Sequence, residues 1–204
     1  MTDTTTDDID EEIAALYRFV SSVLADPPDS EGVTRLLGTA FEPNPGEISG
    51  PLEDGLAGLT AWTNAVSDPT EEAQRLEREH TRLFVGPRPA LQIHESYYAD
   101  DYLGEPLARV KGTFAGLDIA PGEDLREEAD HAAVELAAIA LLKERGDRQA
   151  VEAFLSEHGW WFPELAEDIR NAADGRFYVA IADLIDGLVE LDAERLGIEL
   201  ERER

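Results

Sequence analysis

The sequence predicts an all-α protein, built as a single globular domain of eight to ten helices. In nearly every segment, apolar residues recur at the three- and four-residue spacing of a helix that buries one face. We find no stretch in which apolar and polar residues alternate as they do in a half-buried strand. Signals that start or stop helices separate the periodic segments. A chain of 204 residues is also long enough to bury one large core.

The first helix is expected at about residues 9–25. Asp8 and Glu11 have the spacing of a capping box, in which two side chains satisfy the free amides at a helix start. The sequence Asp26-Pro27-Pro28 ends this helix, because a proline disfavours helical backbone in the residue before it.

The later helices are delimited in the same way. The clearest start is Asp68-Pro69-Thr70-Glu71, which combines a capping carboxylate, a proline at the first helical position and an acid in the first turn. Beyond the first helix we expect helices at about 33–37, 51–66, 69–84, 96–115, 125–145, 147–157, 165–169 and 177–196. Residues 85–95 and 116–124 are predicted to be connectors, and residues 1–8 and 197–204 flexible tails.

Two places interrupt this pattern. Gly104-Glu105-Pro106 offers a point for a bend within the helix at 96–115. Trp160-Trp161-Phe162-Pro163 is a dense aromatic turn, for which we expect core packing at a corner between two helices.

Composition excludes several classes of function. The chain has no cysteine, which rules out disulfides, thiolate metal sites and cysteine catalysis. A formal charge of −28 repels the phosphates of nucleic acids, so no nucleic acid partner is expected. Direct membrane insertion is not expected either, because no apolar run approaches the roughly 18 residues of a membrane span. The acidic start of the chain does not resemble a signal peptide, and we predict a cytoplasmic protein.

The acidic residues are spread along the whole chain, and two explanations account for them. The first is a salt-rich cytoplasm, where molar salt shortens the Debye length to about 3 Å and screens the repulsion. The second is an ordinary protein with an acidic face for a basic partner. The first explanation predicts that the protein unfolds as salt is lowered.

The segment from His80 to Tyr98 is the first candidate for a functional site. A helix ends at Gly86-Pro87, an extended stretch follows, and polar and aromatic residues gather there. Within it, Ser96 has the place of a helix N-cap, and Glu95 is a candidate for recognising a ligand's backbone or cation. A Ser-His-acid triad is rejected for His94-Glu95-Ser96, since adjacent residues rarely converge in that way and no G-x-S-x-G turn is present.

Asp130, His131 and Glu135 form a second candidate cluster on the helix at 125–145. His131 and Glu135 are four residues apart and therefore share a helix face. Three interpretations follow: a surface pair of His131 with Glu135, a polar cluster that binds a partner, or a metal site. Two ligands are weak evidence for a metal, and our prediction contains no metal and no cofactor. Without a coherent catalytic set or a nucleotide-binding pattern, the protein is not predicted to be an enzyme.

Three stretches of the chain resemble the TorD/DmsD/NarJ family of redox-enzyme maturation chaperones. The first is Leu83-Phe84-x-Gly86-Pro87, followed by Glu95-Ser96-x-Tyr98 and Asp100. The second is Glu128-x-Asp130-His131-x3-Glu135-Leu136. The third runs from Phe154-Leu-x2-His158 through Trp161-x-Pro163 to Phe177-Tyr178-x2-Ile181-Ala182. Their order and spacing agree with the family over roughly residues 10–195. A departure is His94, which stands where the family motif has a tryptophan.

The resemblance implies a TorD-like, all-helical cytoplasmic chaperone, present as a monomer or a dimer. Its expected partner is a molybdopterin oxidoreductase precursor of the dimethyl sulfoxide, trimethylamine oxide or nitrate reductase type. The chaperone would bind the twin-arginine signal peptide of that precursor and assist cofactor insertion before export. The implied binding residues are Leu83, Phe84, Gly86, Pro87, His94, Glu95, Ser96, Tyr98, Asp130, His131 and Glu135.

Two other functions remain open. One is a delta-type assembly subunit that stays associated with a nitrate-reductase-like complex. The other is a metal-dependent hydrolase that uses His131 and Glu135.

Overall fold

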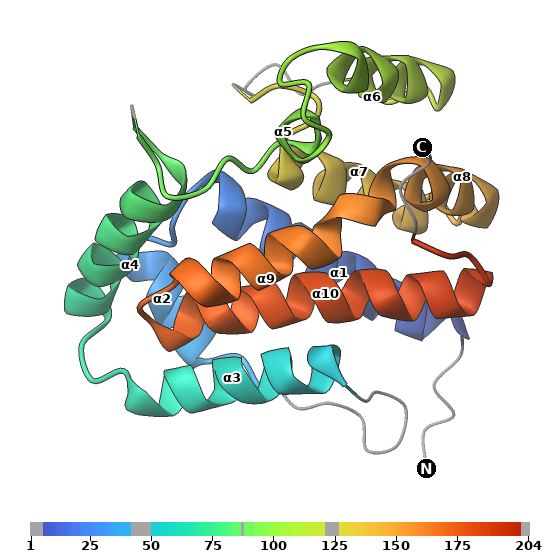
Figure 1. Cartoon of the computed structure of the whole chain (residues 1–204). Coiled ribbons are helices and arrows are strands. Elements are labelled where there is room, and N and C mark those ends of the chain that lie inside the picture. The colour runs from blue at the N-terminus through green and yellow to red at the C-terminus, as the bar shows by residue number, and fades with distance from the viewer. Residues whose placement is uncertain (1–5, 42–49, 87, 121–126, 201–204) are drawn as a thin grey trace. The chain divides into compact units, whose positions relative to one another are not determined.

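The structure is a computed structural model that describes residues 6–41, 50–86, 88–120 and 127–200. For residues 6–9 it describes the backbone alone. Every regular element in these ranges is helical, and the labels run from α1 to α10 with one turn of 3-10 helix, η1 (Figure 1). The prediction of an all-α fold is confirmed. In the described part of the chain, no helix combines the length and the apolar character needed to cross a membrane.

The chain divides into two compact units. Unit 1 comprises residues 1–21, 93–161 and 191–204, and unit 2 comprises residues 22–92 and 162–190. That the two units form a single domain stays a prediction.

Unit 1 contains α5 (Glu95–Tyr98), α6 (Glu105–Gly116), α7 (Ala132–Glu144), α8 (Arg148–His158) and η1 (Gly159–Trp161). Unit 2 contains α2 (Ser30–Leu37), α3 (Pro51–Ala65), α4 (Pro69–Phe84) and α9 (Phe162–Ala172). Helices α1 (Thr6–Ala25) and α10 (Arg176–Leu196) have residues in both.

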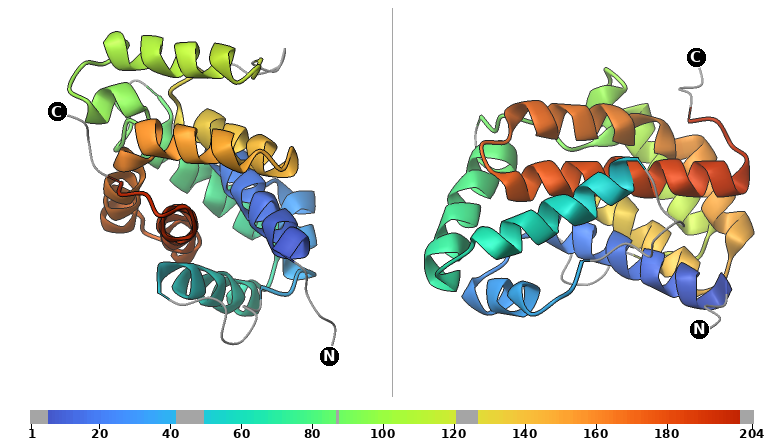
Figure 2. Two further views of the ribbon diagram at one scale, coloured as in Figure 1. Left: turned by 90° about the vertical axis from the view of Figure 1, so that its right-hand side faces the viewer. Right: turned by 90° about the horizontal axis from the view of Figure 1, so that it is seen from below.

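Unit 2 is held by helices that approach closely. A Cβ atom built on Gly187 of α10 would lie 2.1 Å from the backbone nitrogen of Leu52 in α3, so no side chain fits there. Figure 2 shows α3 beside the unit 2 part of α10. At Gly55 of α3, a Cβ atom would lie 2.9 Å from the Leu184 side chain. These two glycines let α3 and the unit 2 part of α10 pack backbone to backbone.

The start of α4 follows the predicted signal. Asp68 accepts hydrogen bonds from the backbone amides of Thr70 and Glu71, and Pro69 occupies the first helical position. Local chemistry therefore determines this boundary, as the sequence predicted.

The boundaries of several helices differ from the predicted ones. Helix α1 begins at Thr6, so Asp8 is inside the helix and the predicted capping box and tail at 6–8 are wrong. The helix predicted at 96–115 is two helices, α5 and α6, with a turn between them in which Asp100 and Leu103 have positive φ angles of 59° and 58°. At the start of α6, Asp101 accepts a hydrogen bond from the Glu105 amide at 2.9 Å. Because α5 and α6 are separate helices, this point is a break and not a bend.

The predicted aromatic turn is the 3-10 turn η1 between α8 and α9, and Phe162 is already the first residue of α9. Trp161 and Phe162 have no exposed surface, which confirms their core packing. The connectors are also largely where the sequence placed them, although residues 121–124 lie outside the described residues.

Candidate functional site

Two segments from different parts of the sequence meet in unit 1. The backbone at His94 and the backbone at His131 form an isolated antiparallel bridge. The Glu95 amide donates to the Asp130 carbonyl at 2.9 Å, and the Ala132 amide donates to the Ile93 carbonyl at 2.9 Å. This bridge brings together residues that the sequence could relate only through a family motif.

Asp130 links the two segments through its side chain. It has no exposed surface, and its Oδ2 accepts from the Ser96 amide at 3.3 Å. Its Oδ1 lies 3.3 Å from His94 Nδ1. Burial opposes ionisation, but the hydrogen bonds from His94 and Ser96 outweigh it and lower the pKa of Asp130 below its ordinary value. Asp130 is therefore a buried carboxylate that fixes the start of α5.

Glu95 is the centre of a second set of hydrogen bonds. Its Oε2 lies 2.8 Å from His158 Nδ1, and its Oε1 accepts from Trp160 Nε1 at 3.2 Å. His158 Nε2 in turn lies 2.9 Å from the Thr113 hydroxyl of α6. Because Glu95 and His158 have at most 1% exposed surface, α5 is connected to α8 by polar contacts closed to solvent.

Glu135 is the third buried carboxylate. Its Oε2 accepts from Trp161 Nε1 at 3.0 Å, and within the described residues its Oε1 has no hydrogen-bond partner. Burial, followed by the negative charge of Glu95, raises the pKa of Glu135 well above its ordinary value. A raised pKa favours the protonated acid, which removes the cost of a buried, unpaired charge.

Two predicted roles are wrong. Ser96 is not an N-cap, because α5 begins at Glu95; the Ser96 hydroxyl instead accepts from the Leu103 amide at 3.1 Å. The surface pair of His131 with Glu135 does not form, since Glu135 is buried against Trp161. His131 is the N-cap of α7, and its Nδ1 accepts from the Ala133 amide at 3.2 Å, so the helix starts later than residue 125.

The structure brings most of the predicted binding residues together in unit 1. His94, Glu95, Ser96, Asp130 and His131 are connected as described above. Glu135 and Tyr98 both contact Trp161, Glu135 through its hydrogen bond and Tyr98 with ring centroids 5.3 Å apart. Of these, Glu95, Ser96, Asp130 and Glu135 have at most 1% exposed surface. In this structure they support the backbone and do not line an open groove.

The other predicted residues belong to unit 2. Leu83 is buried, and Phe84 packs against His80 and Tyr178 with ring centroids 5.2 and 5.7 Å apart. Gly86 has a φ of 102°, which favours glycine. Pro87 lies outside the described residues.

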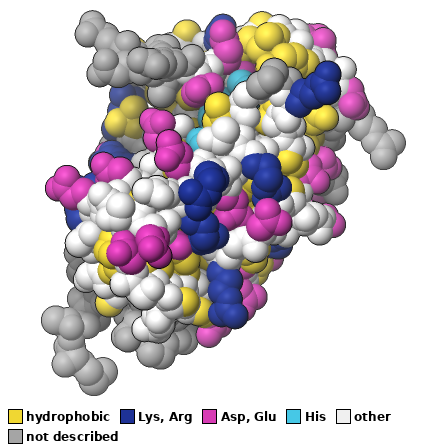
Figure 3. Space-filling view, turned by 90° about the vertical axis from the view of Figure 1, so that its left-hand side faces the viewer, with side chains coloured by type: hydrophobic (Ala, Val, Ile, Leu, Met, Phe, Trp, Pro, Cys, Tyr) yellow, Lys and Arg dark blue, Asp and Glu magenta, His cyan; other side chains and the backbone are white. Residues whose placement is uncertain are grey.

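Sequence reasoning missed the exposed apolar residues of unit 1. Tyr97, Tyr102 and Leu103 have about half of their surface exposed, at 51%, 52% and 48%. They surround the turn between α5 and α6, which the helical periodicity concealed. The ring of Tyr102 also meets the ring of His94 edge to face, with centroids 5.7 Å apart. Figure 3 shows imidazole surface on one face of the protein, with hydrophobic and acidic side chains around it.

The amino-acid sequence matches a known protein family. Residues 47–167 match the family described as "Nitrate reductase delta subunit", which is more than half of the chain. The chain belongs to this family, the TorD/NarJ family that its motifs resemble.

Two relatives named "Chaperone protein TorD" support this assignment. The one from Shewanella loihica is 35% identical over 94 residues, which cover 46% of this chain and 43% of the relative. The one from Vibrio parahaemolyticus is 27% identical over 164 residues, which cover 71% of this chain and 75% of the relative.

Proposed function

We propose that this protein is a redox-enzyme maturation chaperone. In this proposal it binds the twin-arginine signal peptide of a molybdopterin oxidoreductase precursor in the cytoplasm and assists cofactor insertion before export. The family membership and the two relatives named as chaperones support the general class. The observation that supports this binding site is the exposed apolar turn between α5 and α6. Hydrogen bonds connect this turn through Ser96 to the buried Asp130.

The surface of this turn has the chemistry that such a peptide needs. Tyr97, Tyr102 and Leu103 offer apolar surface for the hydrophobic stretch of the peptide. Asp101 in this turn and Glu105 at the start of α6 are exposed carboxylates that can accept hydrogen bonds from the guanidinium groups of arginine. The proposed occupant is therefore a peptide with an arginine pair followed by an apolar stretch.

The buried residues act through the backbone in this proposal. The Ser96 hydroxyl accepts a hydrogen bond from the Leu103 amide, and the Ser96 amide donates one to the Asp130 carboxylate. The Ser96 carbonyl accepts from the Asp101 amide at 3.1 Å. Ser96 thus connects the buried Asp130 carboxylate to the exposed turn. In this proposal Glu95, Asp130 and Glu135 are positioning residues for the peptide surface.

The energetics favour reversible binding. Burying about 400 Å² of apolar surface supplies roughly 10 kcal/mol before costs. Ordering the peptide and losing its translational freedom remove at least about 4 kcal/mol, which leaves about 6 kcal/mol or an affinity of tens of micromolar. A chaperone that later releases its client does not need a higher affinity.

Titration of a fluorescent twin-arginine peptide in molar KCl tests the site. We expect Tyr102→Ser and Leu103→Ser each to weaken binding about tenfold, which is roughly 1.4 kcal/mol of lost apolar contact. The control is Val85→Ser, since Val85 is an equally exposed apolar residue of unit 2, and it is expected to bind like the unchanged protein. A loss confined to Val85→Ser would contradict the proposed surface.

The family description favours a second candidate, a delta-type subunit that stays with a nitrate-reductase-like complex. An affinity pull-down from the native host at high salt separates the two. Recovery of a precursor with its leader uncleaved supports the chaperone, whereas recovery of mature reductase subunits alone supports the delta-type subunit. Asp130→Ala/His131→Ala serves as the control, and loss of the precursor in this variant is expected if the positioning residues hold the peptide surface.

A further inference from the structure

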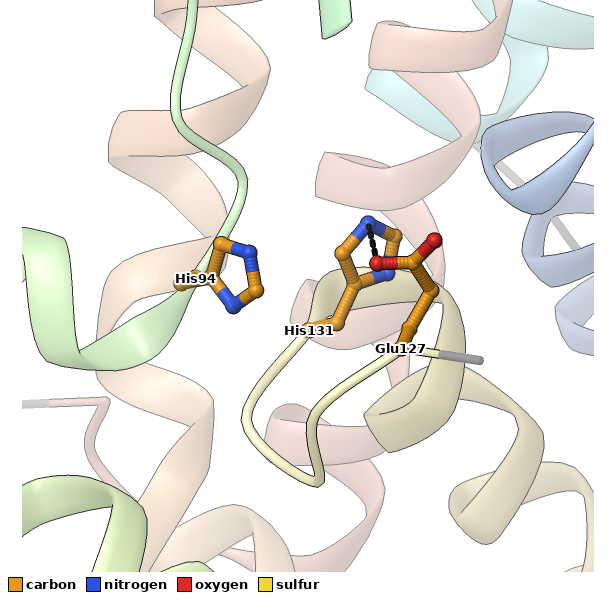
Figure 4. Close-up of side chains that lie close together, drawn as sticks. All are labelled: His94, Glu127 and His131. Atoms are coloured by element: carbon orange, nitrogen blue, oxygen red, sulfur yellow. Dashed lines mark ion pairs between the residues drawn. The ribbon is translucent and has the colours of Figure 1, made fainter. Parts of the chain in front are cut away.

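Three potential metal ligands converge at the surface of unit 1. They are His94, Glu127 and His131, and one ligand atom of each lies within 4.8 Å of the others (Figure 4). The rings of the two histidines meet edge to face with centroids 5.1 Å apart. His131 Nε2 is 3.9 Å from Glu127 Oε2. The backbone bridge between His94 and His131 fixes the relative positions of two of these residues.

We propose that His94, Glu127 and His131 form a binding site for a first-row divalent metal ion such as Zn²⁺. Two imidazoles and one carboxylate are a ligand set that suits Zn²⁺, Ni²⁺ or Co²⁺ better than Mg²⁺ or Ca²⁺, which prefer oxygen ligands alone. This site does not depend on the proposed binding of a signal peptide, and it differs from the pair of His131 with Glu135 considered from the sequence.

The surroundings of His94 favour metal binding. Its Nδ1 lies 3.3 Å from Oδ1 of the buried Asp130. A hydrogen bond from Nδ1–H to a carboxylate is the usual support for a metal-binding histidine, because it orients the ring and makes Nε2 a better electron donor. Asp130 is held in turn by the Ser96 amide, so the carboxylate cannot turn away easily.

Metal binding at His131 is opposed by the role of this residue as a helix cap. Its Nδ1 accepts a hydrogen bond from the Ala133 amide, so the neutral ring carries its proton on Nε2. A metal on Nε2 displaces that proton, and the neutral ring then carries a proton on Nδ1, where it disrupts the cap of α7. Loss of this cap opposes metal binding, so we expect zinc to bind about fivefold more weakly than at an otherwise equal site that keeps its cap.

The geometry requires a small closure. Tetrahedral zinc with ligand bonds of about 2.0–2.2 Å places ligand atoms roughly 3.4 Å from one another. In the structure the ligand atoms are as much as 4.8 Å from one another, so the side chains must move closer together to hold a metal ion. Glu127 can supply most of this movement, since 46% of its side chain is exposed. Water can fill the remaining position of a metal bound by three side chains.

Competition with a chromophoric zinc chelator tests the site on the full chain. The buffer holds molar KCl and excess Mg²⁺, which screens the acidic surface and saturates nonspecific carboxylates. We expect one Zn²⁺ per chain, with affinity reduced at least about tenfold in His94→Gln, Glu127→Gln and His131→Asn. Asparagine is chosen at position 131 because it can still cap α7 while it removes the imidazole.

Glu128→Gln is the matched control, since Glu128 is an exposed neighbouring carboxylate that bonds to Lys111 at 2.8 Å. This variant should bind zinc like the unchanged protein. Co²⁺ supplies a second readout, because visible absorption of four-coordinate cobalt should appear with the unchanged protein and disappear in His94→Gln. Binding of several ions per chain, equal in all variants, would overturn the site, as would zinc affinity unchanged in both His94→Gln and Glu127→Gln. Thermal melting of each variant checks that it is folded.

Discussion

His158 Nδ1 lies 2.8 Å from Glu95 Oε2, and the two side chains are buried with 0% and 1% exposed surface. They are 63 residues apart in sequence, and each comes from a different stretch of the family pattern. The contact connects the short helix α5 to the end of α8. Since α5 has only four residues, its position depends on such tertiary contacts more than on its own helical hydrogen bonds.

His158→Ala is expected to destabilise the protein by about 3 kcal/mol, because it leaves the Glu95 carboxylate buried without its imidazole partner. Chemical denaturation at fixed salt measures this loss. Glu95→Gln is the comparison: glutamine retains an acceptor for Trp160 and carries no charge, so it should cost less. Equal stability of His158→Ala and the unchanged protein would contradict the role of this pair.

Glu72 in unit 2 should make stability depend on pH in the acid range. Hydrogen bonds from Arg75 lower the pKa of Glu72, and the one from Trp62 adds to this against the opposing effect of burial. A lowered folded-state pKa gives stability that is fully present above the ordinary pKa of glutamate, about 4.3, and is lost as the pH falls through the lowered value.

Glu72→Gln should therefore lower stability near neutral pH by no more than about 1 kcal/mol, because the ion pair is partly exposed. The difference in the free energy of unfolding between the two proteins should shrink as the pH falls below about 4.3, the ordinary pKa of glutamate. Denaturation curves across this range measure it. A difference that grows at low pH would contradict the sign.

Two glycine substitutions compare a close helix contact with an open one. Gly187→Ala should destabilise unit 2 by about 2 kcal/mol or more, because its Cβ would meet the Leu52 backbone at 2.1 Å. Gly112→Ala on α6 meets nothing within 4 Å and should raise stability by about 0.5–1 kcal/mol, since alanine favours helix. Melting temperatures test the contrast, and similar effects of both substitutions would contradict the packing of α3 against α10.

The charge of −28 predicts that the protein is more stable in molar KCl than in dilute buffer. Salt screens repulsion between surface carboxylates, and the Debye length falls from about 10 Å at 0.1 M to about 3 Å at 1 M. The melting temperature should rise by several degrees over this range. A melting temperature that does not change with salt would favour the other explanation, an acidic face for a basic partner.

The sequence predicted the elements that depend on local chemistry. Asp68 and Pro69 determine the start of α4 in the structure as they did in the sequence. The start of α7 was predicted too early because Ala129 and Ala132 continue the helical spacing across His131, which ends up as the cap. A periodic pattern records which residues are buried, and Ala129 is buried without being helical.

The candidate site depended more on tertiary structure. The motifs indicated that Glu95, Asp130 and Glu135 matter, but spacing alone placed Glu135 beside His131 at the surface. Its partner is Trp161, 26 residues away. The group of His94, Glu127 and His131 had no sequence signal either, because the bridge that brings His94 to His131 is a contact between distant segments.

The division of the chain into units has a consequence for synthesis on the ribosome. Unit 1 combines residues 1–21, 93–161 and 191–204. Translation proceeds from the N-terminus, so the first two of these segments exist for some time before the third emerges. Lys143 and Asp192, whose side chains lie 2.7 Å apart, can meet only after residue 192 has been made. Unit 1 can therefore be completed only after its third segment, which begins at residue 191, has been made.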